Sequence, residues 1–148
     1  MSQHPKRNGF TLIEMLVILS IVMTIISFSF FHLRGIYEKK VIEQFLEQLQ
    51  EDIWLAQQFA ISHSKSVELS FYENQDFYDV RESGLRSLII QRSFISEINL
   101  KILTITNPIK FNSSGNINGS GALYVMYHNH TYKITFLLGR GRFRIEQL

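Results

Sequence analysis

Hydrophobic residues occur in three different patterns along the chain, and each pattern predicts a different structure. Residues 10–33 are almost entirely apolar, residues 42–60 carry apolar side chains at steps of three and four, and later segments alternate apolar and polar residues. An uninterrupted apolar run longer than roughly 20 residues can cross a bilayer core as a helix. Steps of three and four place side chains on one face of a helix, whereas alternation is typical of half-buried strands.

The first pattern predicts a membrane helix within residues 10–34. A helix bonds its own backbone, which lipid requires, and a chain of 148 residues has no core wide enough to bury so long an apolar helix. The run contains one acid, Glu14, whose carboxylate costs free energy in lipid. Two interpretations stay open: Glu14 reaches the membrane interface, or it has a functional partner.

A short basic leader precedes the apolar run. The segment Lys6-Arg7-Asn8-Gly9 ends immediately before Phe10. An ordinary secretory signal is cleaved at an A-x-A-like site of small residues after its apolar stretch, and no such site follows this run. The sequence from Lys6 to Leu16 resembles the class III leader and N-terminus of type IV pilins and pseudopilins.

This resemblance implies processing and assembly roles for three residues. A prepilin peptidase would cleave between Gly9 and Phe10, and the new terminus at Phe10 would be N-methylated. Glu14 would become the fifth residue of the mature chain, and its carboxylate would pair with the terminal amine of a neighbouring subunit. A charge buried in a filament is tolerable with such a partner.

The second and third patterns predict the head. The helical stripe continues to about Ser62, and strands are expected at 66–72, 77–81, 86–94, 100–106, 122–127, 131–138 and 142–146. One long helix followed only by strands predicts an α+β fold, with the amphipathic half of the helix against an antiparallel sheet. We therefore expect a leader at 1–9, a transmembrane or filament-core helix at 10–34, and a globular head at 35–148. The predicted stripe comprises Ile42, Phe45, Leu46, Leu49, Ile53, Ala56 and Ala60, widened by Trp54 and Phe59, while Glu43, Glu47, Gln48, Glu51 and Asp52 fall largely elsewhere on the helix.

The C-terminal third strengthens the resemblance. Residues 109–115 contain an F-x-x-x-G element, and residues 138–144 contain a G-R-x-R element after a hairpin. This arrangement is similar to the minor pseudopilins of the H type, although residues 81–101 match no part of that pattern. A cysteine-free chain of this size looks most like the GD-type minor pseudopilins of the competence (ComG) pilus of Gram-positive bacteria.

Composition argues against an enzyme. The chain has no cysteine, no G-x-S-x-G element and no H-E-x-x-H pair. His32, His63, His128 and His130 do not have the spacing of a metal site, so we expect no metal and no cofactor. Lys6 and Arg7 of the leader account for the net charge of +2, so the rest of the chain is formally neutral. Residues 35–97 carry an excess of five negative charges, and residues 98–148 an excess of five positive charges.

Three arginines near the C-terminus form the remaining candidate site. Strand alternation would put Arg140, Arg142 and Arg144 on one face, with Phe143 and Ile145 toward the core and Lys133 nearby. Three interpretations stay open: a solvated edge strand whose charges block unwanted pairing, docking onto an acidic face of another subunit, or weak non-specific DNA contact.

The predicted function is that of a minor pseudopilin of a competence pilus, which helps to initiate or assemble the filament used for DNA uptake. Its partners would be the other major and minor pilins, the prepilin peptidase and the membrane. It would lie in the cell membrane before assembly and at the cell surface afterwards. The alternative is a subunit of a type II secretion pseudopilus, which shares the fold and differs in its neighbouring genes.

Overall fold

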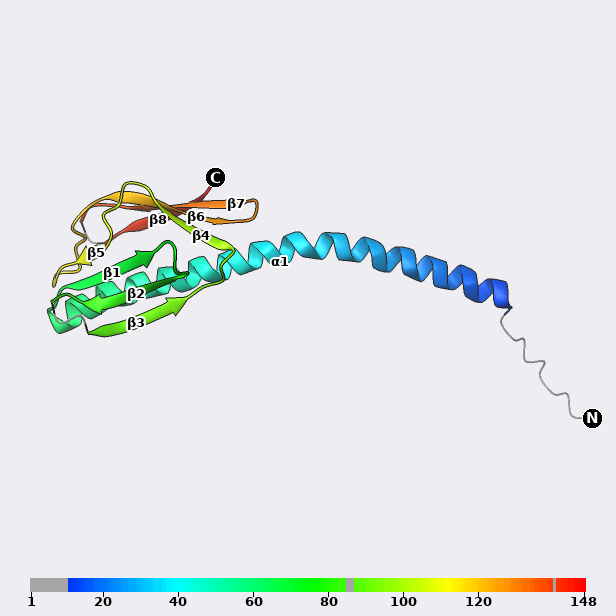
Figure 1. The fold of residues 1–148 in the computed structure, drawn as a ribbon, viewed down its shortest axis with the longest axis horizontal. Helices are drawn as coiled ribbons and strands as arrows, with labels where there is room; N and C mark the ends of the chain where they lie inside the picture. Colours follow the sequence, from blue (N-terminus) through cyan, green and yellow to red (C-terminus); the bar gives the residue numbers. More distant parts are fainter. Residues whose placement is uncertain (1–10, 85–86, 140) are drawn as a thin grey trace, which may run out of the picture. The chain divides into compact units, whose positions relative to one another are not determined.

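The computed structural model describes residues 11–84, 87–139 and 141–148, and within these it leaves the side chains of residues 28–34 undescribed. Contacts divide the chain into two units, residues 1–37 and residues 38–148. The single helix of the described residues, α1, spans Leu12–His63 and contributes to both units (Figure 1). It ends within one residue of the predicted boundary.

The unit of residues 38–148 contains two antiparallel sheets. The first has the strand order β3-β2-β1-β5, from Leu88–Ser93, Phe77–Glu82, Val67–Tyr72 and Ile109–Phe111. The second has the order β4-β6-β7-β8, from Ile98–Ile102, Gly121–Tyr127, His130–Phe136 and Phe143–Gln147. Figure 1 shows both sheets beside the C-terminal half of α1. The predicted α+β class is confirmed, but the strands form two sheets and not one.

Other strand boundaries also differ from the sequence prediction. The strand expected at 100–106 begins earlier and ends at Ile102, because the amides of Leu103 and Thr104 both donate to the Ala122 carbonyl at 3.0 and 3.1 Å. The Thr104 hydroxyl accepts a hydrogen bond from the Ala122 amide at 3.0 Å. A side-chain oxygen thus replaces the backbone carbonyl that would accept this bond if the strand continued. The three-residue strand β5 was not predicted, since so short a segment shows no period.

The core lies between α1 and the two sheets. Six members of the predicted stripe are buried, as expected from their spacing, and Phe45 and Phe59 are partly buried beside them. The stripe packs with the inward residues of both sheets, such as Leu69, Val80 and Ile134, in one hydrophobic cluster. The buried stripe members are Ile42, Leu46, Leu49, Ile53, Ala56 and Ala60.

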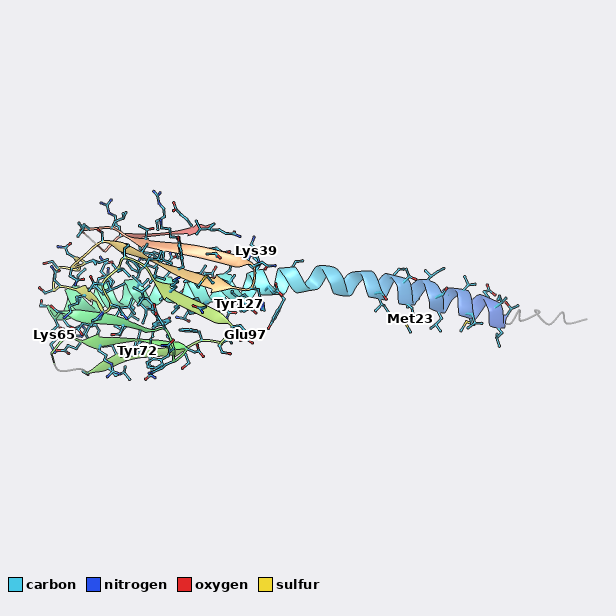
Figure 2. All side chains as sticks on the ribbon, turned by 45° about the horizontal axis from the view of Figure 1, so that its top comes forward. Met23, Lys39, Lys65, Tyr72, Glu97 and Tyr127 are labelled. Carbon is cyan, nitrogen blue, oxygen red and sulfur yellow. The ribbon has the colours of Figure 1, made fainter. Side chains whose placement is uncertain are left out.

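The head has two recognisable ends along α1. In Figure 2, Glu97 and Tyr127 lie at the same end as Lys39, and Lys65 lies at the opposite end. The opposite end also holds the loop of residues 112–116, because Gly115 contacts Ile61 and Gln57 near the end of α1. The glycine of the F-x-x-x-G element therefore lies at this second end, beside the last turns of α1.

Candidate functional site

The beginning of α1 gives Glu14 a local structural role. The Thr11 hydroxyl accepts a hydrogen bond from the Glu14 amide at 3.4 Å, and the Thr11 carbonyl accepts one from the Met15 amide at 3.2 Å. Thr11 is therefore the N-cap and Glu14 the third helical residue. A carboxylate in the first turn interacts favourably with the helix dipole, which reduces the cost of the charge. Gly9 and Phe10, the predicted cleavage site, lie outside the described residues.

Within the described part of the chain, no cation forms an ion pair with Glu14. Its neighbours Leu12, Ile13 and Met15 are all exposed apolar side chains. Within one subunit, the Glu14 carboxylate therefore lies at a helix N-terminus and among apolar side chains, without a described cation beside it. Pairing with the amine of another subunit stays a prediction.

Three described hydroxyl groups of the apolar segment donate to carbonyl groups of the helix itself. Ser20 donates to the Val17 carbonyl, Thr24 to the Ser20 carbonyl and Ser27 to the Met23 carbonyl, each at 2.8 Å. These hydroxyls therefore bring no unsatisfied donor into an apolar environment. The large side chains between Leu12 and Ile26 are exposed, so this surface requires a partner.

Among the residues that the structure describes, no helical stretch has both the length and the hydropathy of a membrane span. The predicted transmembrane or filament-core segment, 10–34, includes residue 10 and the side chains of 28–34, which lie outside the description. That assignment stays a prediction.

The two C-terminal sequence elements meet at one residue of α1. The Gln57 side-chain amide donates to the Gly115 carbonyl at 3.0 Å. A Cβ on Gly115 would lie 2.7 Å from Ile61 Cδ1, and a Cβ on Gly141 would lie 2.7 Å from Gln57 Nε2. Both glycines have positive φ, which other residues rarely adopt, and both permit a close approach to the helix. The F-x-x-x-G and G-R-x-R elements thus join the loop and β8 to α1.

The structure describes two of the three arginines that the alternation places on one face. Arg142 precedes β8, Arg144 lies within it, and Arg140 lies outside the described residues. The Arg144 side chain forms an ion pair with Glu146 at 3.2 Å. Lys133 does join this face, but the register places it directly opposite Glu146. Glu146 therefore offsets part of the positive charge, and DNA contact by the arginines stays a prediction.

A groove of about 550 Å³ lies between α1 and β8. Gln50, Trp54 and Gln57 line it from the helix, and residues 141–145 line it from the C-terminal segment. Trp54 was expected to widen the apolar face, yet half of its surface is exposed in this groove. Its ring lies 6.2 Å from the ring of Phe143, measured between centroids.

Sequence analysis missed a buried acid. Asp52, expected on the polar side of the helix, is 2% exposed and accepts hydrogen bonds from the Tyr78 hydroxyl at 2.7 Å and Arg92 Nε at 3.0 Å. Burial and the bond to Asp52 raise the pKa of Tyr78, and the same carboxylate raises the pKa of Arg92. The sequence did contain one indication of this burial: Asp52 lies three residues after Leu49 and four before Ala56, at the margin of the apolar stripe.

Known structures share this fold at low sequence identity. The type IV minor pilin FimU of Pseudomonas aeruginosa (strain PAO1) has a TM-score of 0.62 at 11% identity, covering 74% of this chain and 90% of that one. The minor pseudopilin EpsH from the Type 2 Secretion System of Vibrio cholerae has a TM-score of 0.58 at 11% identity, covering 72% of this chain and 97% of that one. Residues 4–30 also match the prokaryotic N-terminal methylation motif. Fold and motif together define a type IV pilin-like protein.

A full-length relative narrows this class. The competence protein ComGD of Bacillus subtilis (strain 168) is 30% identical over 142 residues, which cover 96% of this chain and 95% of that protein. The chain belongs to the ComGD family of competence proteins. The pilin-like resemblance of the sequence is thereby confirmed.

Proposed function

We propose that this chain is a minor pilin of a competence type IV pilus, which helps to initiate or assemble the filament used for DNA uptake in natural transformation. The observation that carries the proposal is the match to a competence protein over nearly the whole of both chains. The pilin-like head and the N-terminal methylation motif support it independently. Such a subunit acts by assembling with other pilins, and it is a structural component and not an enzyme.

Processing and localisation follow from the same proposal. The prepilin peptidase cleaves between Gly9 and Phe10, Phe10 is N-methylated, and the apolar helix holds the subunit in the cell membrane until assembly. The motif match over residues 4–30 and the exposed apolar side chains from Leu12 to Ile26 support membrane anchoring. After assembly the head lies at the cell surface as part of the pilus.

A secretion pseudopilus is the alternative system. EpsH has a similar head, but 11% identity supports only the shared fold. Because a minor pilin of either system has this architecture, the fold does not separate them. The competence relative favours DNA uptake, and neighbouring genes for DNA-uptake proteins rather than secretion components would agree with it.

Deletion and complementation test the proposed function. We expect a strain lacking this chain to lose natural transformation and to regain it when the full chain is supplied. Measuring secreted proteins in the same strains provides the comparison, and their amounts should not change. Normal transformation together with a secretion defect would assign the chain to the alternative system.

A further inference from the structure

The strand β8 has a free edge, and its register identifies which backbone groups lie there. The Leu137 amide donates to the Arg142 carbonyl at 2.8 Å, and the Leu148 amide donates to the Thr131 carbonyl at 2.9 Å. Bonded pairs alternate in an antiparallel ladder, so the even-numbered residues of this segment bond to β7. The amides and carbonyls of Phe143, Ile145 and Gln147 therefore point away from β7. The strand order ends at β8, and no described strand pairs with this edge.

The groove of about 550 Å³ is lined by residues 143–145 of this strand and by residues of α1. Phe143 and Ile145 are half-buried and pack against the core, and Gln50 and Trp54 line the groove from α1. The second sheet thus ends before it covers this side of the helix. One further strand beside β8 would bond to the free edge and cover the exposed half of Trp54.

The two faces of such a strand would meet different chemistry. Residues opposite Phe143 and Ile145 would point inward, toward Trp54, and would need apolar side chains. Residues opposite Arg142 and Arg144 would point outward beside two exposed guanidinium groups. Glu146 pairs with Arg144 and offsets part of this charge, and the remaining excess is positive, so acidic side chains fit there. The groove therefore suits an extended segment in which apolar and acidic residues alternate.

We propose that β8 is a docking edge, to which another pilin subunit adds an extended segment of alternating apolar and acidic residues. This inference rests on the proposed function, which supplies neighbouring subunits. A peptide is favoured over single-stranded DNA because backbone amides and carbonyls alternate along the edge, and a phosphate backbone offers no donors to the carbonyls.

Site-specific photo-cross-linking in cells that assemble the pilus tests the docking edge. A photoreactive amino acid at position 50 lies in the groove, and the same group at position 55, an exposed helix position that does not line the groove, serves as its control. We expect position 50 to yield an adduct with another pilin subunit, joined through a segment of the alternating pattern. Position 55 should not yield that adduct.

Two substitutions of Ile145 then isolate the strand edge. Ile145→Pro removes an amide on the free edge and no bond to β7, whereas Ile145→Ala loses a similar packing contact but keeps the amide. We expect Ile145→Pro to lower the adduct about tenfold and Ile145→Ala to change it less than about twofold. Equal yields from both variants would overturn strand addition.

Charge reversal covers the case in which Ile145→Pro does not fold. Arg142 and Arg144 are exposed, so the double variant Arg142→Glu/Arg144→Glu should retain the head and lose most of the adduct. Replacing both by lysine should retain the adduct. A wild-type yield in the glutamate variant would exclude an acidic partner. A nuclease-sensitive adduct at position 50 would assign the groove to DNA and overturn the proposal.

Transformation separates failure of this inference from failure of the proposed function. If deletion of the chain leaves transformation unchanged, the competence role fails. If deletion abolishes transformation and the folded Ile145→Pro or Arg142→Glu/Arg144→Glu variant restores it fully, the competence role stands and the docking edge is wrong.

Discussion

Tyr78 of β2 donates its hydroxyl hydrogen to the Asp52 carboxylate of α1 across 2.7 Å, and both side chains are almost fully buried. Arg92 of β3 bonds to the same carboxylate at 3.0 Å. One acid of the helix is thus bound by two adjacent strands of the first sheet. Because hydrogen bonds are directional, this cluster fixes the position of the sheet along the helix more narrowly than apolar contacts would.

Removing this carboxylate should destabilise the head. Asp52→Ala leaves the buried Tyr78 hydroxyl without its acceptor, which costs roughly 2 to 3 kcal/mol, whereas Tyr78→Phe removes one bond and costs about 1 kcal/mol. Urea unfolding of a protein comprising residues 38–148 measures both free energies. Equal, negligible effects would mean that the cluster contributes no stability.

The pH dependence provides a second readout of the same pair. Burial and the bond to Asp52 raise the pKa of Tyr78 in the folded head above its ordinary value of about 10. The stability that the protonated Tyr78 hydroxyl contributes is therefore fully present below a pH of about 10, the pKa of an unfolded tyrosine. It is lost as the pH rises from there through the raised pKa of the folded head. Tyr78→Phe should lose less stability than the wild type over that alkaline range.

The helix stripe predicts a strong effect at Leu49. This residue is fully buried, so Leu49→Asp loses roughly 1.5–3 kcal/mol of apolar burial and also buries a charge. We expect the head to unfold, as measured by circular dichroism. Leu55→Asp is the matched control, since Leu55 lies on the same helix and is 44% exposed. Unfolding by both variants would point to helix disruption and not to the core.

Gly121, the first residue of β6, and Gly119, two residues before it, should respond differently to alanine. A Cβ on Gly121 would lie 2.4 Å from Ile105 backbone atoms, which cannot move independently, whereas Gly119 has no atom nearer than 4.0 Å. Gly121→Ala should cost more than about 2 kcal/mol, and Gly119→Ala less than about 0.5 kcal/mol. Thermal unfolding of both variants tests this difference, and a stable Gly121→Ala would show that the two segments can separate.

Processing is tested at Gly9. Gly9→Val places a branched side chain at the predicted cleavage position, so the chain should keep its full precursor length on a gel in cells that contain the peptidase. The unsubstituted chain in the same cells should be shortened. Shortening of the variant to the same size would refute cleavage after Gly9.

Assembly is tested at Glu14. Glu14→Ala removes a charge from the apolar segment, so membrane insertion should be equal or better, while transformation should fall because the amine of the next subunit loses its partner. Glu14→Gln should show the same loss, since it keeps the size but not the charge. Normal transformation by both variants would remove the carboxylate from the mechanism.

Local patterns determined which segments form which elements. The apolar residues from Ile42 to Ala60 recur at the period of a helix, so their burial could be predicted without knowing what covers them. The alternation in β1 likewise places Val67, Leu69 and Phe71 on one face, and all three are buried. The basic leader before Phe10 and the acid at Glu14 carry the pilin-like motif in consecutive residues, so the sequence contains that resemblance in full.

Tertiary structure decided every feature that depends on residues far apart in the chain. The strands divide into two sheets because β5 returns to β1 while β4 pairs with β6, and strand pairing across such distances leaves no period in the sequence. Asp52 is buried because Tyr78 and Arg92 come to it from other elements. The groove at β8 exists because the second sheet ends there beside Trp54, and the end of a sheet is a property of the assembled fold and not of any one segment.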